Sequence, residues 1–200
     1  MFVQVITGTT SDREGLQRQA DRWQDELRPG ATGYLGSTAG VTDDGRFVLL
    51  ARFESEEAAR RNSARDQQGD WWNETEKYLE GAAFQDSVEV TTLLGGGSNR
   101  AGFLQVMRGR VIDADKIAAI GSRMAESEGA LRRHRPDVLG ELIVMHPDAT
   151  YTEVVYFTSE EAARQGESTD PPAEMQALFG ELMEAITVDE YLDLEDPWLR

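Results

Sequence analysis

The sequence predicts an α+β protein made of two copies of one β–α–β–β–α–β unit, fused head to tail. Three pairs of matching segments indicate the duplication: residues 2–8 with 103–109, residues 35–36 with 139–140, and residues 53–60 with 157–164. The last pair is identical at seven of eight positions, and chance rarely supplies such a match in register with two others. The offset grows from 101 to 104, which indicates a short insertion between the first two strands of the second copy.

The elements of the first copy follow from periodicity and turn chemistry. Residues 2–7 alternate and contain β-branched residues, which predicts a strand. Ser11 and Glu14 form a capping box before a helix whose apolar stripe contains Leu16, Ala20, Trp23 and Leu27. Further strands are expected at residues 33–41, 46–53 and 86–94, and further helices after Ser55 and around Trp72.

The second copy repeats this order. Asp113 is expected to cap its first helix, and strands are predicted near residues 138–145, 150–157 and 189–195. Helical segments are predicted near residues 160–166 and 173–186. Each copy should therefore form a four-stranded antiparallel sheet with helices on one face.

The domain boundaries are predicted at residues 1–94 and 101–200, separated by a linker at residues 95–100. That linker is rich in Gly and lacks the Gly-Lys-Ser/Thr ending of a phosphate-binding loop. In the strand at residues 46–53, apolar side chains point to both faces of the sheet. Because helices cover only one face, we expect the two sheets to pack on each other around a pseudo-twofold axis.

Composition limits the classes of partner. The 200 residues carry a net charge of −17, which disfavours nucleic acids and anionic membrane surfaces, since both are bound through Lys and Arg. The absence of Cys excludes disulfides and thiolate nucleophiles. The N-terminal residues do not resemble a signal peptide, and no apolar run reaches the ~20 residues that span a bilayer. A cytoplasmic protein is expected.

This order of elements resembles the dimeric α/β-barrel superfamily, with two ferredoxin-like units, and within it the antibiotic-biosynthesis-monooxygenase-like group. The resemblance covers the whole chain and is based on the Phe-x-Gln-Val first strand, the segment at residues 53–60, and the helix with Trp71 and Trp72. It implies a small-molecule pocket in each sheet–helix unit. Members of this group include cofactor-independent oxygenases of aromatic compounds and haem-degrading enzymes, and fold alone does not choose among them.

The resemblance implies catalytic roles for Gln4, Trp71 and Trp72. The group's oxygenases use a first-strand amide, usually Asn, and here Gln4 and Gln105 occupy that position. A Gln on a buried strand needs a partner, so each is either a substrate contact or a structural amide. Trp71 and Trp72 point about 100° apart on a helix, so we expect only one of them to face a pocket. Core packing is the alternative role for both.

Further candidates for substrate binding surround this helix: Tyr34, Asn62, Arg65, Asn73 and Tyr78, with Gln105 in the second copy. Arg65 could hold a carboxylate or phenolate, and the alternative is a solvated helix face. The second copy has Met175 and Gln176 in place of the two tryptophans, so the first pocket is the better candidate.

No metal site and no cofactor are predicted. His134 and His146 are assigned to a pre-strand loop and a hairpin turn, away from the helix where the resemblance places an axial haem ligand. The leading hypothesis is a cofactor-independent monooxygenase acting on a hydrophobic or aromatic molecule, and the alternative is a non-catalytic binding or stress-related module. The expected assembly is a monomer with pseudo-twofold symmetry, and a homodimer stays open.

Overall fold

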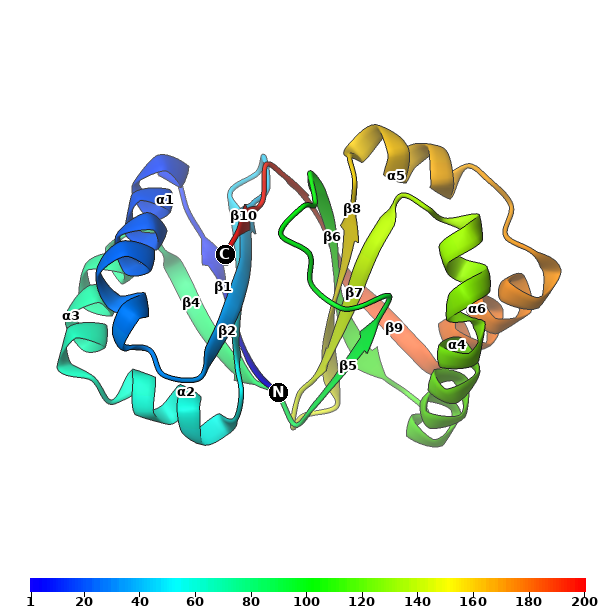
Figure 1. Ribbon diagram of the computed structural model, residues 1–200, viewed down its shortest axis with the longest axis horizontal. Helices are drawn as coiled ribbons and strands as arrows, with labels where there is room; N and C mark the ends of the chain where they lie inside the picture. The colour runs from blue at the N-terminus through cyan, green and yellow to red at the C-terminus, as the bar shows by residue number, and fades with distance from the viewer. The chain divides into compact units, whose positions relative to one another are not determined.

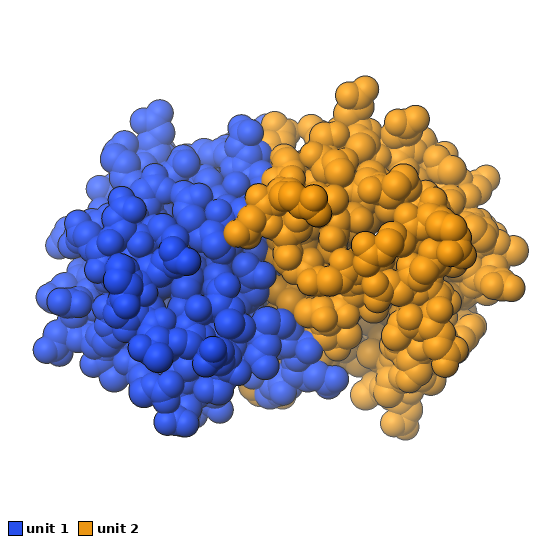
Figure 2. Space-filling model, in the orientation of Figure 1, with its two compact units in different colours: residues 1–90, 196–200 blue, residues 91–195 orange.

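The chain forms two compact units, which together account for all residues from 1 to 200 of the computed structural model (Figure 2). The first unit comprises residues 1–90 and 196–200, and the second comprises residues 91–195. Each contains a five-stranded antiparallel sheet with helices on one face (Figure 1). The predicted α+β class and ferredoxin-like repeats are confirmed, with one more strand in each sheet than expected.

The first sheet has the strand order β10-β2-β3-β1-β4. Its members are β1 (Phe2–Thr9), β2 (Tyr34–Val41), β3 (Arg46–Phe53), β4 (Glu80–Asp86) and β10 (Trp198–Leu199). β1 is central, and Gln4 on it lies opposite Ala51 of β3 and Asp86 of β4. Ile6, two residues further along, points to the same face, which the helices cover.

The second sheet has the equivalent order β5-β7-β8-β6-β9. Its members are β5 (Glu89–Leu93), β6 (Phe103–Val111), β7 (Val138–Met145), β8 (Thr150–Phe157) and β9 (Ile186–Glu195). The predicted strands at residues 138–145 and 150–157 are confirmed to the residue. β6 is central in this sheet, and Gln105 on it lies opposite Val155 and Asp193.

The expectation of one strand over residues 86–94 is wrong. β4 ends at Asp86 and belongs to the first sheet, whereas β5 belongs to the second. The end of the second copy makes the converse exchange, because β10 pairs with β2 of the first sheet. Local periodicity could not show this, since the choice of sheet depends on pairing between residues far apart in the sequence.

Gly36 and Gly140, which are equivalent in the two copies, leave room for the backbone that follows β10 and β5, respectively. A Cβ atom at Gly36 would lie 2.5 Å from the carbonyl oxygen of Arg200, and one at Gly140 would lie 1.6 Å from that of Gly96. Gly36 also has a positive φ of 145°, which side chains rarely adopt. The register of β2 against β3 shifts just before Gly36, as β7 against β8 shifts before Gly140. The glycine of the repeated Leu-Gly pair is therefore a backbone requirement.

The helices are α1 (Arg13–Arg22), α2 (Glu56–Ser63), α3 (Asp66–Thr75), α4 (Ala114–His134), α5 (Glu160–Glu167) and α6 (Ala173–Ala185). Ser55 and Asp113 cap α2 and α4 as predicted, by accepting from the backbone N–H groups of Ala58 and Lys116. Ser11 is not the cap of α1. Asp12 accepts from Gly15 N at 2.7 Å instead, since a carboxylate suits the positive end of a helix better than a hydroxyl does.

The helical segment that begins with α1 continues beyond Arg22 as a π helix, which is wider than an α-helix. A π-helical turn, η1 (Trp23–Leu27), follows α1, and the backbone N–H of Arg28 donates to the Trp23 carbonyl. Two short 3₁₀ turns, η2 (Arg28–Gly30) and η3 (Glu76–Tyr78), complete the first unit. In the second unit α4 is α-helical throughout. π turns of this kind often occur at functional sites, because the extra residue redirects the side chains.

Apolar clusters join the helices to each sheet. In the first unit, Leu16 of α1 packs with Ile6, Phe47 and Trp198, and Ala58 and Ala59 of α2 pack with Phe2 and Phe53. In the second unit the cluster contains Phe103, Leu131, Phe157 and Met175. No helix is long and apolar enough to cross a membrane. The packing of one sheet on the other stays a prediction.

Candidate functional site

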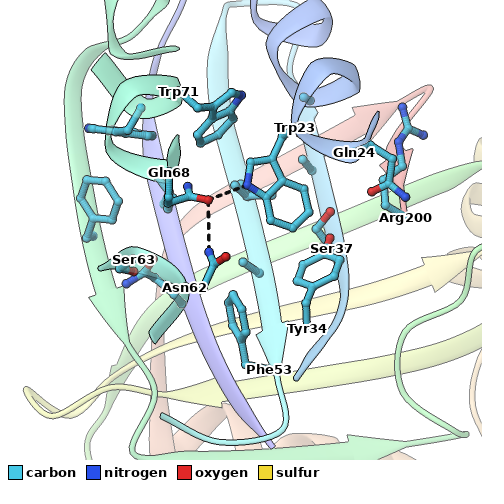
Figure 3. A pocket seen from close by; sticks show the side chains of 18 of the residues that line it. Trp23, Gln24, Tyr34, Ser37, Phe53, Asn62, Ser63, Gln68, Trp71 and Arg200 are labelled. Carbon is cyan, nitrogen blue, oxygen red and sulfur yellow. Dashed lines mark hydrogen bonds between the residues drawn. The ribbon is translucent and has the colours of Figure 1, made fainter. Parts of the chain in front are cut away.

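The first unit encloses a cavity of about 300 Å³ between its sheet and its helices (Figure 3). Such a volume is at the small end of the range for ligand sites, ~300–1,000 Å³. The walls come from β1–β4, α1–α3, η1 and β10. Its aromatic lining consists of Trp23, Tyr34, Phe53, Trp71, Trp72, Phe84 and Trp198. All four tryptophans of the chain therefore line this one cavity.

The aromatic rings contact one another along the wall. The Trp23 ring centroid lies 4.7 Å from that of Tyr34 and 6.5 Å from that of Trp71. The Trp72 and Phe84 rings meet edge to face at 4.8 Å. These tilted and edge-on arrangements are the ones that aromatic pairs prefer, so the rings hold each other in place. The result is a rigid apolar surface suited to a flat, unsaturated molecule.

Hydrogen bonds hold two of the indoles in place. Trp23 Nε1 donates to Gln68 Oε1 at 2.7 Å, and Asn62 Nδ2 donates to the same oxygen at 3.2 Å (Figure 3). Trp71 Nε1 donates to the Gln19 carbonyl at 2.8 Å. Both indole N–H groups are thus satisfied by the protein, and the rings remain available for contact with a ligand.

Removing the shared acceptor should cost stability. In Gln68→Leu, Trp23 Nε1 and Asn62 Nδ2 lose their common partner, and we expect the free energy of unfolding to fall by about 1–3 kcal/mol. Urea unfolding followed by far-UV circular dichroism measures this. Gln67→Ala, at the exposed neighbouring position, is the control and should change little. Equal losses in the two variants would contradict this assignment.

Few polar groups point into the cavity. Gln24 Oε1 is shielded from solvent and has no hydrogen-bond partner. Tyr34 Oη is also shielded and makes no hydrogen bond of ordinary geometry, although the nearby Ser37 hydroxyl interacts with it. Burial raises the pKa of Tyr34, against smaller opposing effects of Ser37 and Arg52, so the phenol stays protonated at neutral pH. An unpaired acceptor and a hydroxyl donor are therefore available to a ligand.

Arg200 supplies the only charged side chain of the lining. Its Nη2 donates to Asp21 Oδ1 at 2.5 Å, and its backbone exchanges hydrogen bonds with Ser37 on β2. No lining residue is Asp, Glu, His or Lys, so the cavity contains no base of ordinary strength. Elsewhere in the chain no group of three or more His, Asp or Glu side chains is placed to bind a metal ion.

Sequence comparisons do not place the chain, since neither a family model nor a curated protein matches it. Solved structures are similar. A proposed monooxygenase from Lactobacillus acidophilus superposes with a TM-score of 0.71 at 15% identity, over 96% of this chain and 91% of that one. A proposed monooxygenase from Fusobacterium nucleatum gives 0.76 at 7% identity, over 100% and 93%. An anthrone oxidase-like protein gives 0.69 at 12% identity, over 100% and 92%.

The chain shares the fold of these proteins. At this level of identity the likeness concerns the fold alone, and it agrees with the resemblance inferred from the sequence. Each neighbour is covered over more than nine tenths of its length, so the similarity includes both repeats.

Five of the predicted site residues meet at the first cavity: Gln4, Tyr34, Asn62, Trp71 and Trp72. The expectation that only one tryptophan of the adjacent pair faces a pocket is wrong. Their ring centroids are 6.1 Å apart, and both rings line the cavity. Gln4 has a side-chain partner, with Nε2 donating to Asp86 Oδ1 at 3.0 Å.

The other predicted residues lie elsewhere. Arg65 donates to the Leu27 carbonyl and to Asn62 Oδ1, so it ties α2 to the end of η1 and lies outside the cavity lining. Asn73 is exposed on α3, and Tyr78 packs against the cluster around Leu16. Gln105 lines a separate cavity in the second unit, where Nε2 donates to Glu167 Oε1 at 2.7 Å.

Sequence reasoning missed Trp23, Gln24, Trp198 and Arg200 as cavity residues. Trp23 lies on the predicted apolar stripe of the first helix, and that stripe faces the cavity, since Ala20 one turn earlier lines it too. Trp198 and Arg200 reach the cavity because β10 pairs with β2, and no local sequence pattern indicates this long-range pairing. His134 was also misplaced, since it is the last residue of α4 and lines the second cavity. His146 does lie in a hairpin, where its ring Nε2 is 3.0 Å from Thr152 Oγ1.

Proposed function

We propose that the first cavity binds a hydrophobic, aromatic small molecule and that the protein is a cofactor-independent monooxygenase acting on it. The main support is the cavity wall, where all four tryptophans surround an unpaired acceptor and a buried phenol. Aromatic faces recognise a planar ligand, and a few placed polar groups orient it. The similarity to proteins named as monooxygenases and anthrone oxidase-like is consistent with this function.

The lack of a base in the lining restricts the substrate. The molecule must have a C–H bond acidic enough to give its proton to water, as in an anthrone, whose carbanion is stabilised by the neighbouring carbonyl and rings; the peroxide that forms with O₂ takes a proton back from water before it loses H₂O. The Tyr34 hydroxyl and the Arg200 guanidinium are then the groups that stabilise the negative charge on the substrate oxygen. Addition of O₂ to the carbanion and loss of water would convert the CH₂ group to a carbonyl, with one oxygen atom entering each product.

Turnover is tested with anthrone in air, by following oxygen uptake and quinone absorbance. We expect Tyr34→Phe and Gln4→Ala to lower kcat/KM by about tenfold or more, since each removes a polar group of the cavity lining. Gln176→Ala, an exposed position on α6, is the matched control for Gln4→Ala and should retain full activity. Turnover equal to that of the buffer blank would contradict an oxygenase of this substrate class.

The same lack of a base favours one alternative, a binding module that does not transform its ligand. Ligand binding is measurable separately, because every tryptophan lines the cavity and an aromatic ligand should quench the intrinsic fluorescence. Quenching by an anthrone that is recovered unchanged supports the binding module. Quenching with oxygen uptake supports the enzyme.

A further inference from the structure

A second cavity, of about 280 Å³, lies in the second unit between its sheet and its helices. Apolar side chains form much of its wall: Met124, Leu131, Val138, Val155, Phe157, Met175, Phe179 and Leu182. Three carboxyl side chains also line it: Glu141 on β7, Glu153 on β8 and Glu167 at the end of α5. The first cavity has no carboxyl group in its lining.

Because the chain is duplicated, the residues of the first copy that are equivalent to Glu141 and Glu153 can be identified. In the first sheet Ser37 lies opposite Ala51 and Leu49 lies opposite Ala39. In the second sheet Glu141 lies opposite Val155 and Glu153 lies opposite Ile143. Counted from the matching glycines and along β3 and β8, Glu141 occupies the place of Ser37, and Glu153 that of Leu49. Two cavity positions that are uncharged in one unit are acidic in the other.

The two carboxyls interact directly and lack a cationic partner. Glu141 is 8% exposed and Glu153 is half-buried, and the two lie diagonally on one face of β7 and β8, where they can share a hydrogen bond only if one of them is protonated. Burial raises the pKa of both groups, that of Glu153 to about 7. Neither forms an ion pair with Arg, Lys or His of this chain. Buried carboxyls without a counter-charge are costly, so folding alone does not account for them.

Two other charged residues of this wall, Arg135 and Glu167, already have partners. Arg135 on the wall is paired with Asp137 at 2.8 Å. Glu167 accepts from Gln105 and Arg164. His134 at the end of α4 is the remaining titratable group of the helical wall. Tyr151 on β8 and Tyr191 on β9 have pKa values raised by burial first, and the charge of Glu153 adds to this. The uncompensated charge therefore resides on the glutamate pair.

We propose that this second cavity binds a small hydrophobic molecule carrying a protonated amine, with the ammonium group held by Glu141 and Glu153. The apolar wall accommodates the hydrocarbon part, and the ammonium group supplies the positive charge that the chain itself lacks. The proposal is independent of the function of the first cavity, since the two linings share no residue.

Binding of an ammonium ion favours the ionised form of the pair, so it should release a proton. For a site whose pKa is about 7, affinity for the amine should fall about tenfold between pH 8 and pH 6. The amine itself, with a pKa of about 10, stays charged over that range.

The probe is 2-phenylethylamine, with the neutral 2-phenylethanol for comparison, titrated into the full chain by calorimetry. We expect the amine to bind at least tenfold more tightly than the alcohol at pH 8. At pH 7 its apparent enthalpy should differ between HEPES and phosphate buffers, because the released proton is taken up by the buffer. Tryptophan fluorescence should stay unchanged, since no tryptophan lines this cavity.

Two variants of one position keep the test independent of folding. Glu153→Gln retains the shape, and Glu153→Leu restores the residue of the first copy. Both should weaken amine binding at least tenfold and leave the alcohol within twofold. Glu126→Gln, an exposed carboxyl on α4, is the control. Equal binding of amine and alcohol, no proton release, fluorescence quenching by the amine, or affinity unaffected by both Glu153 variants would each overturn the proposal.

Discussion

Replacement of Trp198 by Ala is expected to lower the free energy of unfolding of the first unit by about 3–5 kcal/mol, the usual cost of deleting a buried Trp. Trp198 is 5% exposed and packs with Ile6, Leu16 and Phe47, although it belongs to a strand of only two residues at the end of the sequence. Its ring centroid lies 6.3 Å from that of Phe47. The same ring lines the cavity, so ligand binding to the first unit should weaken too.

Chemical unfolding monitored by circular dichroism measures this effect, and Leu199→Ala is the matched control. Leu199 is the other residue of β10, is half-buried, and lies outside the cavity lining, so its truncation should cost less than about 1.5 kcal/mol. Gly36→Val should also lower the free energy of unfolding, because the Val side chain would collide with the Arg200 carbonyl. Equal, small losses in Trp198→Ala and Leu199→Ala would show that β10 is not docked.

Glu153→Gln is expected to make the protein more stable at alkaline pH and to flatten the dependence of its stability on pH. The folded-state pKa of Glu153 is about 7, against about 4.3 in an unfolded chain. The folded state binds this proton more tightly, so the stabilising contribution is complete below the unfolded pKa. It is lost as the pH rises toward 7. Between pH 5 and pH 8 the wild type should lose roughly 2–3 kcal/mol relative to the variant.

Urea titrations at pH 5, 6, 7 and 8 provide the measurement. Gln keeps the shape and a hydrogen bond to Glu141 but does not ionise, so the difference between wild type and variant reports the buried carboxyl. Glu126→Gln removes an exposed carboxyl and should follow the wild type at every pH. A constant difference between wild type and Glu153→Gln across the series would mean that Glu153 ionises normally in the folded chain.

Much of the fold could be predicted because its signals are local. The strands at residues 138–145 and 150–157 and the caps Ser55 and Asp113 depend on alternation and on side chains within a few positions. The cap at Asp12 was missed by one residue, because two adjacent residues there can both accept a hydrogen bond. The duplication strengthens the prediction of secondary structure, since an element predicted in one copy is expected at the equivalent position of the other.

The candidate site was predicted only in part. Gln4, Trp71 and Trp72 came from the family resemblance, and the cavity does contain them. Trp23 lies on the predicted apolar stripe of the first helix, but the stripe alone does not show whether its residues face a packed core or a cavity. A direct comparison of the two copies would have revealed Glu153 in the place of Leu49, because a carboxyl at a position that is apolar in the other copy is an unusual substitution.

The sequence by itself determined the repeat, the order of strands and helices in each copy, and the acidic, cysteine-free character of the chain. These properties depend on residue type and on spacing over a few positions. Only the tertiary structure decided the exchange of β5 and β10, the gathering of four tryptophans around one cavity, and the contact between Glu141 and Glu153. Each of these requires residues distant in sequence to meet, and their meeting depends on the free energy of the whole packed unit rather than on any local preference.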